Sequence, residues 1–166
     1  MVEYREADPS LESLWRPLRL LFASIDADIA RIYREARIEG LKPSYVQELL
    51  RLKASGPMTI TELADSVALT HSATSQKVAA MRRAGLVRTT PGADARSKRV
   101  TLTAKAKRIV EQLAAEWRAT EAAIAEIEAE VPYPLSAVVA DIEQALQRSS
   151  FYERVLNELA EDPAWH

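Results

Sequence analysis

The chain has 166 residues, 48% of them hydrophobic, a formal net charge of −2 and no cysteine. Its length and apolar content suit one globular domain, and the lack of cysteine excludes disulfides, thiolate metal sites and thiol redox switches. No apolar run is long enough to span a bilayer and no signal-peptide pattern opens the sequence, so we expect a cytoplasmic protein without membrane contact.

Charge is distributed unevenly along the chain. Residues 71–108 contain ten lysines or arginines against one acidic residue, whereas residues 111–166 contain three basic against twelve acidic residues. The low net charge therefore hides a local positive field in the middle of the sequence. Such a field favours binding of a polyanion at one end of the fold.

The first half of the chain begins with helical periodicity. Apolar residues recur at helical spacing over residues 18–36, and the pattern ends at Gly40. Pro17 either opens this helix at its first position or separates two helical pieces. Pro43 then begins a second helix, which the Ser55-Gly56-Pro57 sequence stops.

Two capped helices follow at close spacing. Thr59 and Glu62 form a capping box at the start of a short helix of about two turns. Thr70 is a second N-cap, for a helix that runs to about Arg83 and is closed by Gly85. Two such helices joined by a short turn predict a helix-turn-helix.

Beyond Gly85 the apolar period changes from helical to alternating. Residues 86–90 and 99–102 are predicted strands, and residues 91–94 are turn formers. The result is a two-stranded hairpin with a charged tip. A helix-turn-helix followed directly by such a hairpin is a winged helix.

The last third is helical again. Thr103 caps a long helix that Val131-Pro132-Tyr133-Pro134 breaks, and a further helical region follows. Ser150 and Glu153 match a capping box, so this region is either one helix or two. The apolar stripes of the terminal helices exceed what one winged-helix lobe can cover, which predicts that a second copy of the chain covers them.

The central pattern resembles that of the MarR-type transcription regulators. The resemblance rests on the Leu63-Ala64 helix, the Gly85-Leu86-Val87 strand start, the Asp94-x-Arg96 wing and the closing Leu102-Thr103. Thr74 and Lys77 stand where the recognition helix of that family often has aliphatic residues, and Ala106 replaces a usual glycine.

The resemblance implies a mainly α fold with a small β-hairpin wing, forming one structural domain overall. Residues 1–40 would be an N-terminal dimerisation helix, residues 41–103 the winged helix-turn-helix lobe and residues 104–166 the C-terminal dimerisation helices. It also implies a homodimer, double-stranded DNA as the partner and a small, often aromatic or phenolic effector.

The second capped helix carries the predicted base contacts. The amide of Gln76 can bond adenine N6 and N7 together, and Ser72 and Ser75 can reach a base edge or a phosphate. The alternative is a polar, solvated helix face. The full set of predicted contacts from this helix is Thr70, His71, Ser72, Ser75, Gln76 and Lys77.

The hairpin tip carries the second group of predicted contacts. By resemblance, Arg96 enters the minor groove, with Asp94 holding its guanidinium, while Lys98 and Arg99 contact phosphates. The alternative is a basic loop with a weak surface ion pair. Further candidates for phosphate contact are Arg82, Arg83 and Arg88.

Three aromatic residues, Tyr33, Tyr45 and Trp117, are candidates for an effector pocket, although core packing explains each of them singly. An enzyme is not expected, because the sequence has two histidines, no cysteine nucleophile, no glycine-rich phosphate loop and no metal-spaced cluster. We expect no cofactor.

The sequence thus predicts a homodimeric, ligand-responsive repressor that binds a pseudo-palindromic operator. The alternative is a winged-helix protein-protein interaction module without sequence-specific DNA binding.

Overall fold

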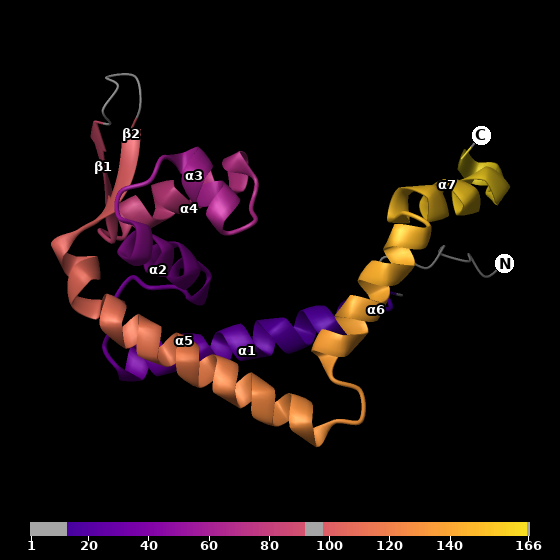
Figure 1. Cartoon of the computed structure of the whole chain (residues 1–166), viewed down its shortest axis with the longest axis horizontal. Helices are drawn as coiled ribbons and strands as arrows, with labels where there is room; N and C mark the ends of the chain where they lie inside the picture. Colours follow the sequence, from indigo (N-terminus) through magenta and orange to yellow (C-terminus); the bar gives the residue numbers. More distant parts are fainter. Residues whose placement is uncertain (1–12, 92–97, 166) are drawn as a thin grey trace, which may run out of the picture. The chain divides into compact units, whose positions relative to one another are not determined.

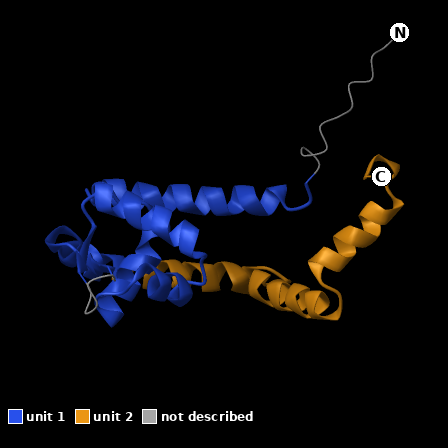
Figure 2. Ribbon diagram, turned by 90° about the horizontal axis from the view of Figure 1, so that it is seen from above, with its two compact units in different colours: residues 1–114 blue, residues 115–166 orange. Residues whose placement is uncertain are grey.

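The computed structural model of the protein describes residues 13–91 and 98–165. The chain forms two compact units, residues 1–114 and residues 115–166 (Figure 2), and each is described by itself. This division concerns compactness alone, and the boundaries predicted at residues 40 and 103 stay a prediction.

The first unit contains helices and one hairpin (Figure 1). Its elements are α1 (Arg16–Glu35), the 3-10 turn η2 (Pro43–Tyr45), α2 (Val46–Ser55), α3 (Ile60–Ser66), α4 (His71–Arg83), β1 (Val87–Pro91), β2 (Lys98–Leu102) and the start of α5 (Ala104–Glu130). The mainly α fold with a two-stranded wing, predicted from the sequence, is confirmed.

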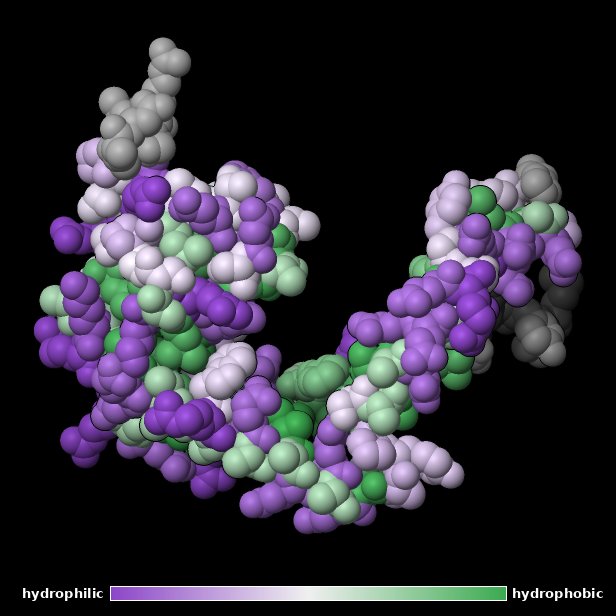
Figure 3. Space-filling view, viewed as in Figure 1, coloured by the Kyte–Doolittle hydropathy of each residue, from purple (hydrophilic) through white to green (hydrophobic). Residues whose placement is uncertain are grey.

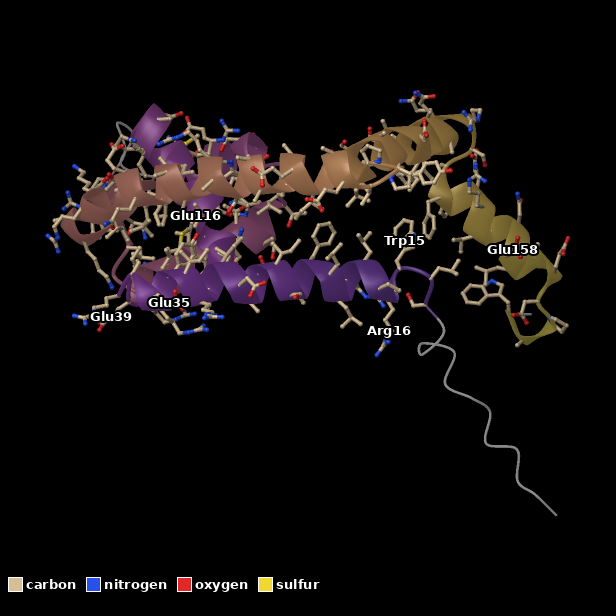
Figure 4. All side chains as sticks on the ribbon, turned by 90° about the horizontal axis from the view of Figure 1, so that it is seen from below. Trp15, Arg16, Glu35, Glu39, Glu116 and Glu158 are labelled. Carbon is tan, nitrogen blue, oxygen red and sulfur yellow. The ribbon has the colours of Figure 1, made fainter. Side chains whose placement is uncertain are left out.

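Helix α1 begins one residue before Pro17, which lies in its first turn. Proline fits there because its missing N–H would have no partner inside the helix. The structure therefore agrees with the first of the two sequence alternatives, except that the helix begins at Arg16, one residue earlier than predicted. Trp15 and Arg16 mark the N-terminal end of α1 in Figure 4, and Glu35 marks its last turn. Glu35 accepts a hydrogen bond of 2.8 Å from Arg31.

The first unit has a continuous apolar core. Its fully buried side chains include Leu49 of α2, Leu63 of α3, Met81 of α4 and Leu113 of α5, each 0% exposed. Tyr33 is the buried residue of α1. The helix-turn-helix, the wing base and the first turns of α5 therefore share one core.

The predicted local signals for the helix-turn-helix are confirmed. Thr59 Oγ1 accepts from the Glu62 N–H at 3.2 Å, and Glu62 Oε2 accepts from the Thr59 N–H at 2.7 Å. Thr70 Oγ1 accepts from the Ala73 N–H at 3.2 Å and caps α4. These hydrogen bonds satisfy amide groups that a helix start leaves without partners.

The wing strands pair antiparallel with Thr89 opposite Val100. Met58, just before α3, forms an additional bridge to Val100, with backbone hydrogen bonds in both directions. The base of the wing is thus tied to the entry of the helix-turn-helix through the backbone.

The exit from α4 is tied to the start of α5. Gly85 has φ +71°, the left-handed conformation that favours glycine after a helix. Thr103 Oγ1 donates to the carbonyl of Gly85 at 2.7 Å and also accepts from the Ala106 N–H at 3.2 Å. Lys105 Nζ donates to the carbonyl of Ala84 at 3.1 Å. The positive charge of Lys105 therefore lies at the negative end of α4.

The second unit consists of the rest of α5, α6 (Leu135–Arg148), α7 (Phe151–Glu161) and the 3-10 turn η3 (Pro163–Trp165). The capping box of Ser150 and Glu153 is present and begins a separate helix, so the region is two helices. Arg154 donates to the carbonyls of Ser149 and Ala145 at the end of α6, at 3.0 and 3.1 Å.

Helix α6 has no side-chain cap from its own N-cap residue, Pro134. Instead, Glu128 of α5 accepts from the Ser136 N–H at 2.7 Å and from the Ser136 hydroxyl at 2.6 Å. These two hydrogen bonds lower the pKa of Glu128 below its ordinary value, the one from the hydroxyl more than the one from the backbone.

Over residues 13–91 and 98–165, no helix is both long enough and apolar enough to cross a bilayer.

Candidate nucleic-acid interface

The outer face of α4 is polar at its N-terminal end. His71, Ser72 and Gln76 are exposed, and Ser75 is half-buried on the side toward the wing. The inner face is formed by Val78 and Met81, with Thr74 buried among them. Gln76 and Ser72 are four residues apart and so share one face, as the sequence predicts.

Lys77 differs from its prediction as an outward contact. Its side chain is 25% exposed, and Nζ forms an ion pair of 2.5 Å with Oε1 of Glu48 on α2. The Glu48 side chain is 0% exposed. The ammonium group of Lys77 is therefore held inside the helix-turn-helix, because a buried carboxylate needs a charged partner.

Sequence reasoning missed Glu48, although a signal for it exists. Glu48 lies three residues after Tyr45 and four before Leu52, so it shares the apolar face of α2 with two buried residues. A single carboxylate on such a face predicts a buried partner elsewhere, but periodicity alone does not say which residue that is.

Two buried polar atoms near the inner face of α4 have no hydrogen-bond partner within the described part of the chain. They are Oε2 of Glu48 and Oγ1 of Thr74, and both side chains are 0% exposed. Each unsatisfied buried group costs about 1–3 kcal/mol. The two unpaired polar atoms between α2 and α4 therefore lower the free energy of unfolding.

Arg99 of β2 was also predicted to contact DNA, and the structure gives it internal partners. Its Nη1 donates to the carbonyl of Pro57 at 2.8 Å, and Nη2 lies 3.8 Å from Oε1 of Glu62. Arg99 thus joins the wing to the start of α3. The pKa of Glu62 is lowered, first by the hydrogen bond from the Thr59 backbone and, as the smallest contribution, by the charge of Arg99.

Other predicted wing residues have different positions. Lys98 is exposed at the start of β2, and Arg88 is exposed on β1. Asp94 and Arg96 lie outside the described residues, so their predicted roles stay predictions.

A pocket of about 200 Å³ lies between α4 and the wing. Its polar lining comes from Ser75 and Arg82 of α4, Thr89 of β1 and Lys98 of β2. Apolar side chains complete it, among them Val78 and Val100, which are buried, together with Ile60 and Ala79. Two cationic residues from different elements therefore border one opening, although 16 positions separate them in the sequence.

Thr89 was not among the predicted contacts, because a threonine in a strand carries no distinguishing signal. Arg82 and Arg83 are exposed in the last turn of α4, where cations are favourable for the helix dipole. Of these two, Arg82 is the one that lines the pocket.

The three residues predicted for an effector pocket occupy different environments. Tyr33 lines a second pocket, of about 540 Å³, together with Arg34, Arg37 and other residues at the end of α1. Tyr45 is 6% exposed in the core, and Trp117, in the second unit, is 37% exposed. The structure thus places Tyr33 beside a cavity and Tyr45 in the packed core.

The order and pairing of elements in the first unit define a winged helix-turn-helix. Comparison with known proteins specifies this class further. Residues 39–97 match the sequence model of the MarR family. No curated protein matches the chain.

Solved structures give the same result. The chain is similar to the Mycobacterium tuberculosis transcriptional regulator MosR in complex with DNA, with 28% identity, coverage of 82% of this chain and 98% of that one, and a TM-score of 0.59. It shares its fold with Staphylococcus aureus MepR in a DNA complex (16% identity, 82% and 97% covered, TM-score 0.61). The same holds for a MarR protein from Peptoclostridium difficile (16% identity, 94% and 97% covered, TM-score 0.56).

These matches confirm the resemblance stated from the sequence, since the matched segment and these similar structures are those of MarR-type winged helix-turn-helix regulators.

Proposed function

We propose that the protein is a DNA-binding transcription regulator in which α4 enters the major groove and the wing lies against the flanking minor groove. The observation that carries this proposal is the pocket between α4 and the wing. Arg82 and Lys98 border it from the two elements that a winged helix applies to adjacent grooves. The phosphate backbone between those grooves would pass over this opening, where two cations and two hydroxyl groups can bind it.

Base reading is assigned to the exposed face of α4. The exposed residues of α4 include Gln76, Ser72 and His71. The N-terminus of α4, which is capped, is the positive end of the helix dipole and favours contact with DNA. Two relatives with this fold, MosR and MepR, are described in complexes with DNA. These facts support Gln76 as the principal base contact.

We further propose that the protein acts as a homodimer on a pseudo-palindromic operator. In the second unit α6 and α7 contain no buried residue, and Val139, Leu156 and Phe151 are 44%, 44% and 67% exposed. Figure 3 shows hydrophobic side chains at the surface of these helices. A second copy covering them would give a dimer with two α4 helices, and dimeric helix-turn-helix proteins bind half-sites about 34 Å apart.

Repression and release by a small aromatic ligand complete the proposal. A ligand releases DNA only if it binds more tightly to a dimer whose lobes are wrongly spaced. The pocket beside Tyr33 is lined by Arg34 and Arg37 and by one acidic residue, Glu39, so its charged side chains sum to a net positive charge that would suit an aromatic carboxylate.

The test is selection of duplexes from a random DNA pool by the purified protein at about 0.15 M salt, where non-specific binding is weakened. We expect enrichment of an inverted repeat with half-sites about one helical turn apart. Gln76→Ala should weaken binding to the selected duplex by about 1–3 kcal/mol per half-site and relax preference at one base pair. Gln112→Ala, an exposed glutamine on α5, is the matched control and should bind as the wild type does.

Two outcomes would contradict the proposal. Enrichment of no sequence, with weak binding even at low salt, would favour the interaction-module alternative. Equal base preference in Gln76→Ala would remove Gln76 as a reader. Adding aromatic carboxylates to the selected complex tests ligand response, and retention of DNA at millimolar ligand would argue against it.

A further inference from the structure

We propose that Glu48, which is buried, and Lys77, which is partly buried, form a positioning pair that sets the orientation of α4, so that Lys77 influences DNA sequence preference without touching DNA. This proposal rests on the proposed function. It concerns two residues that lie 29 positions apart, one on α2 and the other on α4.

The pair joins α2, which is packed into the core, to α4, the helix that carries the polar outer face. Helix α2 is fixed in the core by Val46, Leu49 and Leu52, which are 1%, 0% and 3% exposed. Glu48 extends from the same buried face with no exposed surface and contacts Lys77 Nζ. The contact therefore holds α4 in a defined position relative to the core of the lobe.

Stability does not account for the pair. Replacing a buried ion pair by apolar residues of similar size is often neutral or stabilising. Here the second oxygen of Glu48 and the hydroxyl of Thr74, on the same side of α4, lack partners in the described part of the chain. A wholly apolar contact between α2 and α4 would avoid these costs.

The pair adds a directional interaction that fixes the orientation of α4. Apolar contacts are non-directional, whereas an ammonium–carboxylate hydrogen bond has a restricted distance and angle. Successive residues of a helix are rotated by about 100°, so holding Lys77 inward fixes where Gln76 points. A rotation of α4 by about 20° would move a side chain at the helix surface by about 2 Å, enough to break a bidentate hydrogen bond to a base.

The test is a charge-balanced double variant, Glu48→Leu with Lys77→Met. The charge of the pair is zero before and after, so electrostatic attraction to DNA stays unchanged unless Lys77 itself binds a phosphate. We expect urea denaturation midpoints equal to or above that of the wild type. Binding to random duplex and its salt dependence should be unchanged, while preference for the selected duplex over random duplex falls at least tenfold.

Two variants keep the test interpretable. Glu48→Gln preserves size and tests the charge alone, so it serves if the double variant fails to fold, and its preference should also fall. The matched control replaces the other ion pair of α2, with Lys53→Met and Glu111→Leu. That pair has an N–O distance of 2.7 Å and side chains 36% and 75% exposed, and its loss should leave preference unchanged.

Two results would overturn the proposal. If the slope of log K against log salt concentration falls by about one per subunit in the double variant, Lys77 is a phosphate contact. If sequence preference is retained in the double variant and in Glu48→Gln, the pair does not position α4. Failure of the wild type to bind any duplex would instead overturn the proposed function, so the two failures are distinct.

Discussion

The two compact units differ in the interactions that stabilise each of them internally. Within the described residues, every buried side chain lies in residues 1–114, where helices and wing share one apolar core. In residues 115–166 the contacts between successive helices are polar hydrogen bonds. Glu128 caps the N-terminus of α6, and Arg154 of α7 donates to carbonyls at the C-terminus of α6. The first unit therefore has a core of its own, whereas the second leaves the apolar faces of its helices exposed, where the proposed dimer would cover them.

The largest effect is expected when the same leucine-to-alanine substitution is made in each unit and the free energies of unfolding are compared. Leu49→Ala should lower the free energy of unfolding by about 3–5 kcal/mol, because it leaves a cavity in a fully packed core. Leu146→Ala, at a position 36% exposed, removes the same atoms from α6. Its cost should depend on protein concentration, since the side chain would be buried only in the proposed dimer. Urea denaturation at several concentrations measures both.

A cost for Leu146→Ala that is as large as that of Leu49→Ala and independent of concentration would break the comparison. The second unit would then possess an internal core.

A second substitution tests what covers α6. Ile142→Glu should weaken dimerisation by about 2–3 kcal/mol, on the order of a hundredfold, because a carboxylate replaces an alkyl group on the apolar face in both copies. Sedimentation velocity at micromolar concentration should then detect monomer. Gln144→Glu introduces the same charge on the opposite side of α6 and should remain dimeric. Equal sedimentation of both variants and the wild type would exclude this face as the dimer contact.

The smallest effect concerns pH and the polar joint between α5 and α6. The pKa of Glu128 is lowered below its ordinary value of 4.5, so its carboxylate contributes stability above pH 4.5 that is lost as pH falls through the lower folded value. Glu128→Gln should therefore melt earlier than the wild type at pH 7, and the difference should shrink at strongly acidic pH. Thermal melting followed by circular dichroism measures this difference.

Glu126→Gln, on the other side of α5, is the control for this experiment. If it lowers the melting temperature as much as Glu128→Gln does, the cap on Ser136 has no specific effect.

Features set by neighbouring residues were predictable from sequence. The capping boxes of Thr59 with Glu62 and of Ser150 with Glu153 each join residues three apart, so a short window contains all the information. The hairpin was predictable in the same way, because alternation and turn formers are local signals. The sequence left open whether α6 and α7 are one helix, since a capping box can also lie unused within a longer helix.

Features that join distant residues were not predictable. Lys77 was predicted to face outward from its position on α4, but its partner Glu48 comes from another helix. Arg99 was assigned to DNA by its charge, yet Pro57 and Glu62 lie beside it in the fold. In both cases the charge suggested a polyanion, and the tertiary structure adds an internal acceptor that the sequence did not reveal. A count of basic residues therefore does not show which of them also have partners inside the fold, and their predicted contacts with DNA stay predictions.

The bonds between the end of α4 and the start of α5 have a mechanical consequence. Carbonyls of Ala84, Gly85 and Leu86 are bound by Lys105 and Thr103, and α5 then continues without interruption to Glu130. Any change in the orientation of the last turn of α4 therefore has to move the first turn of α5 with it or break these hydrogen bonds.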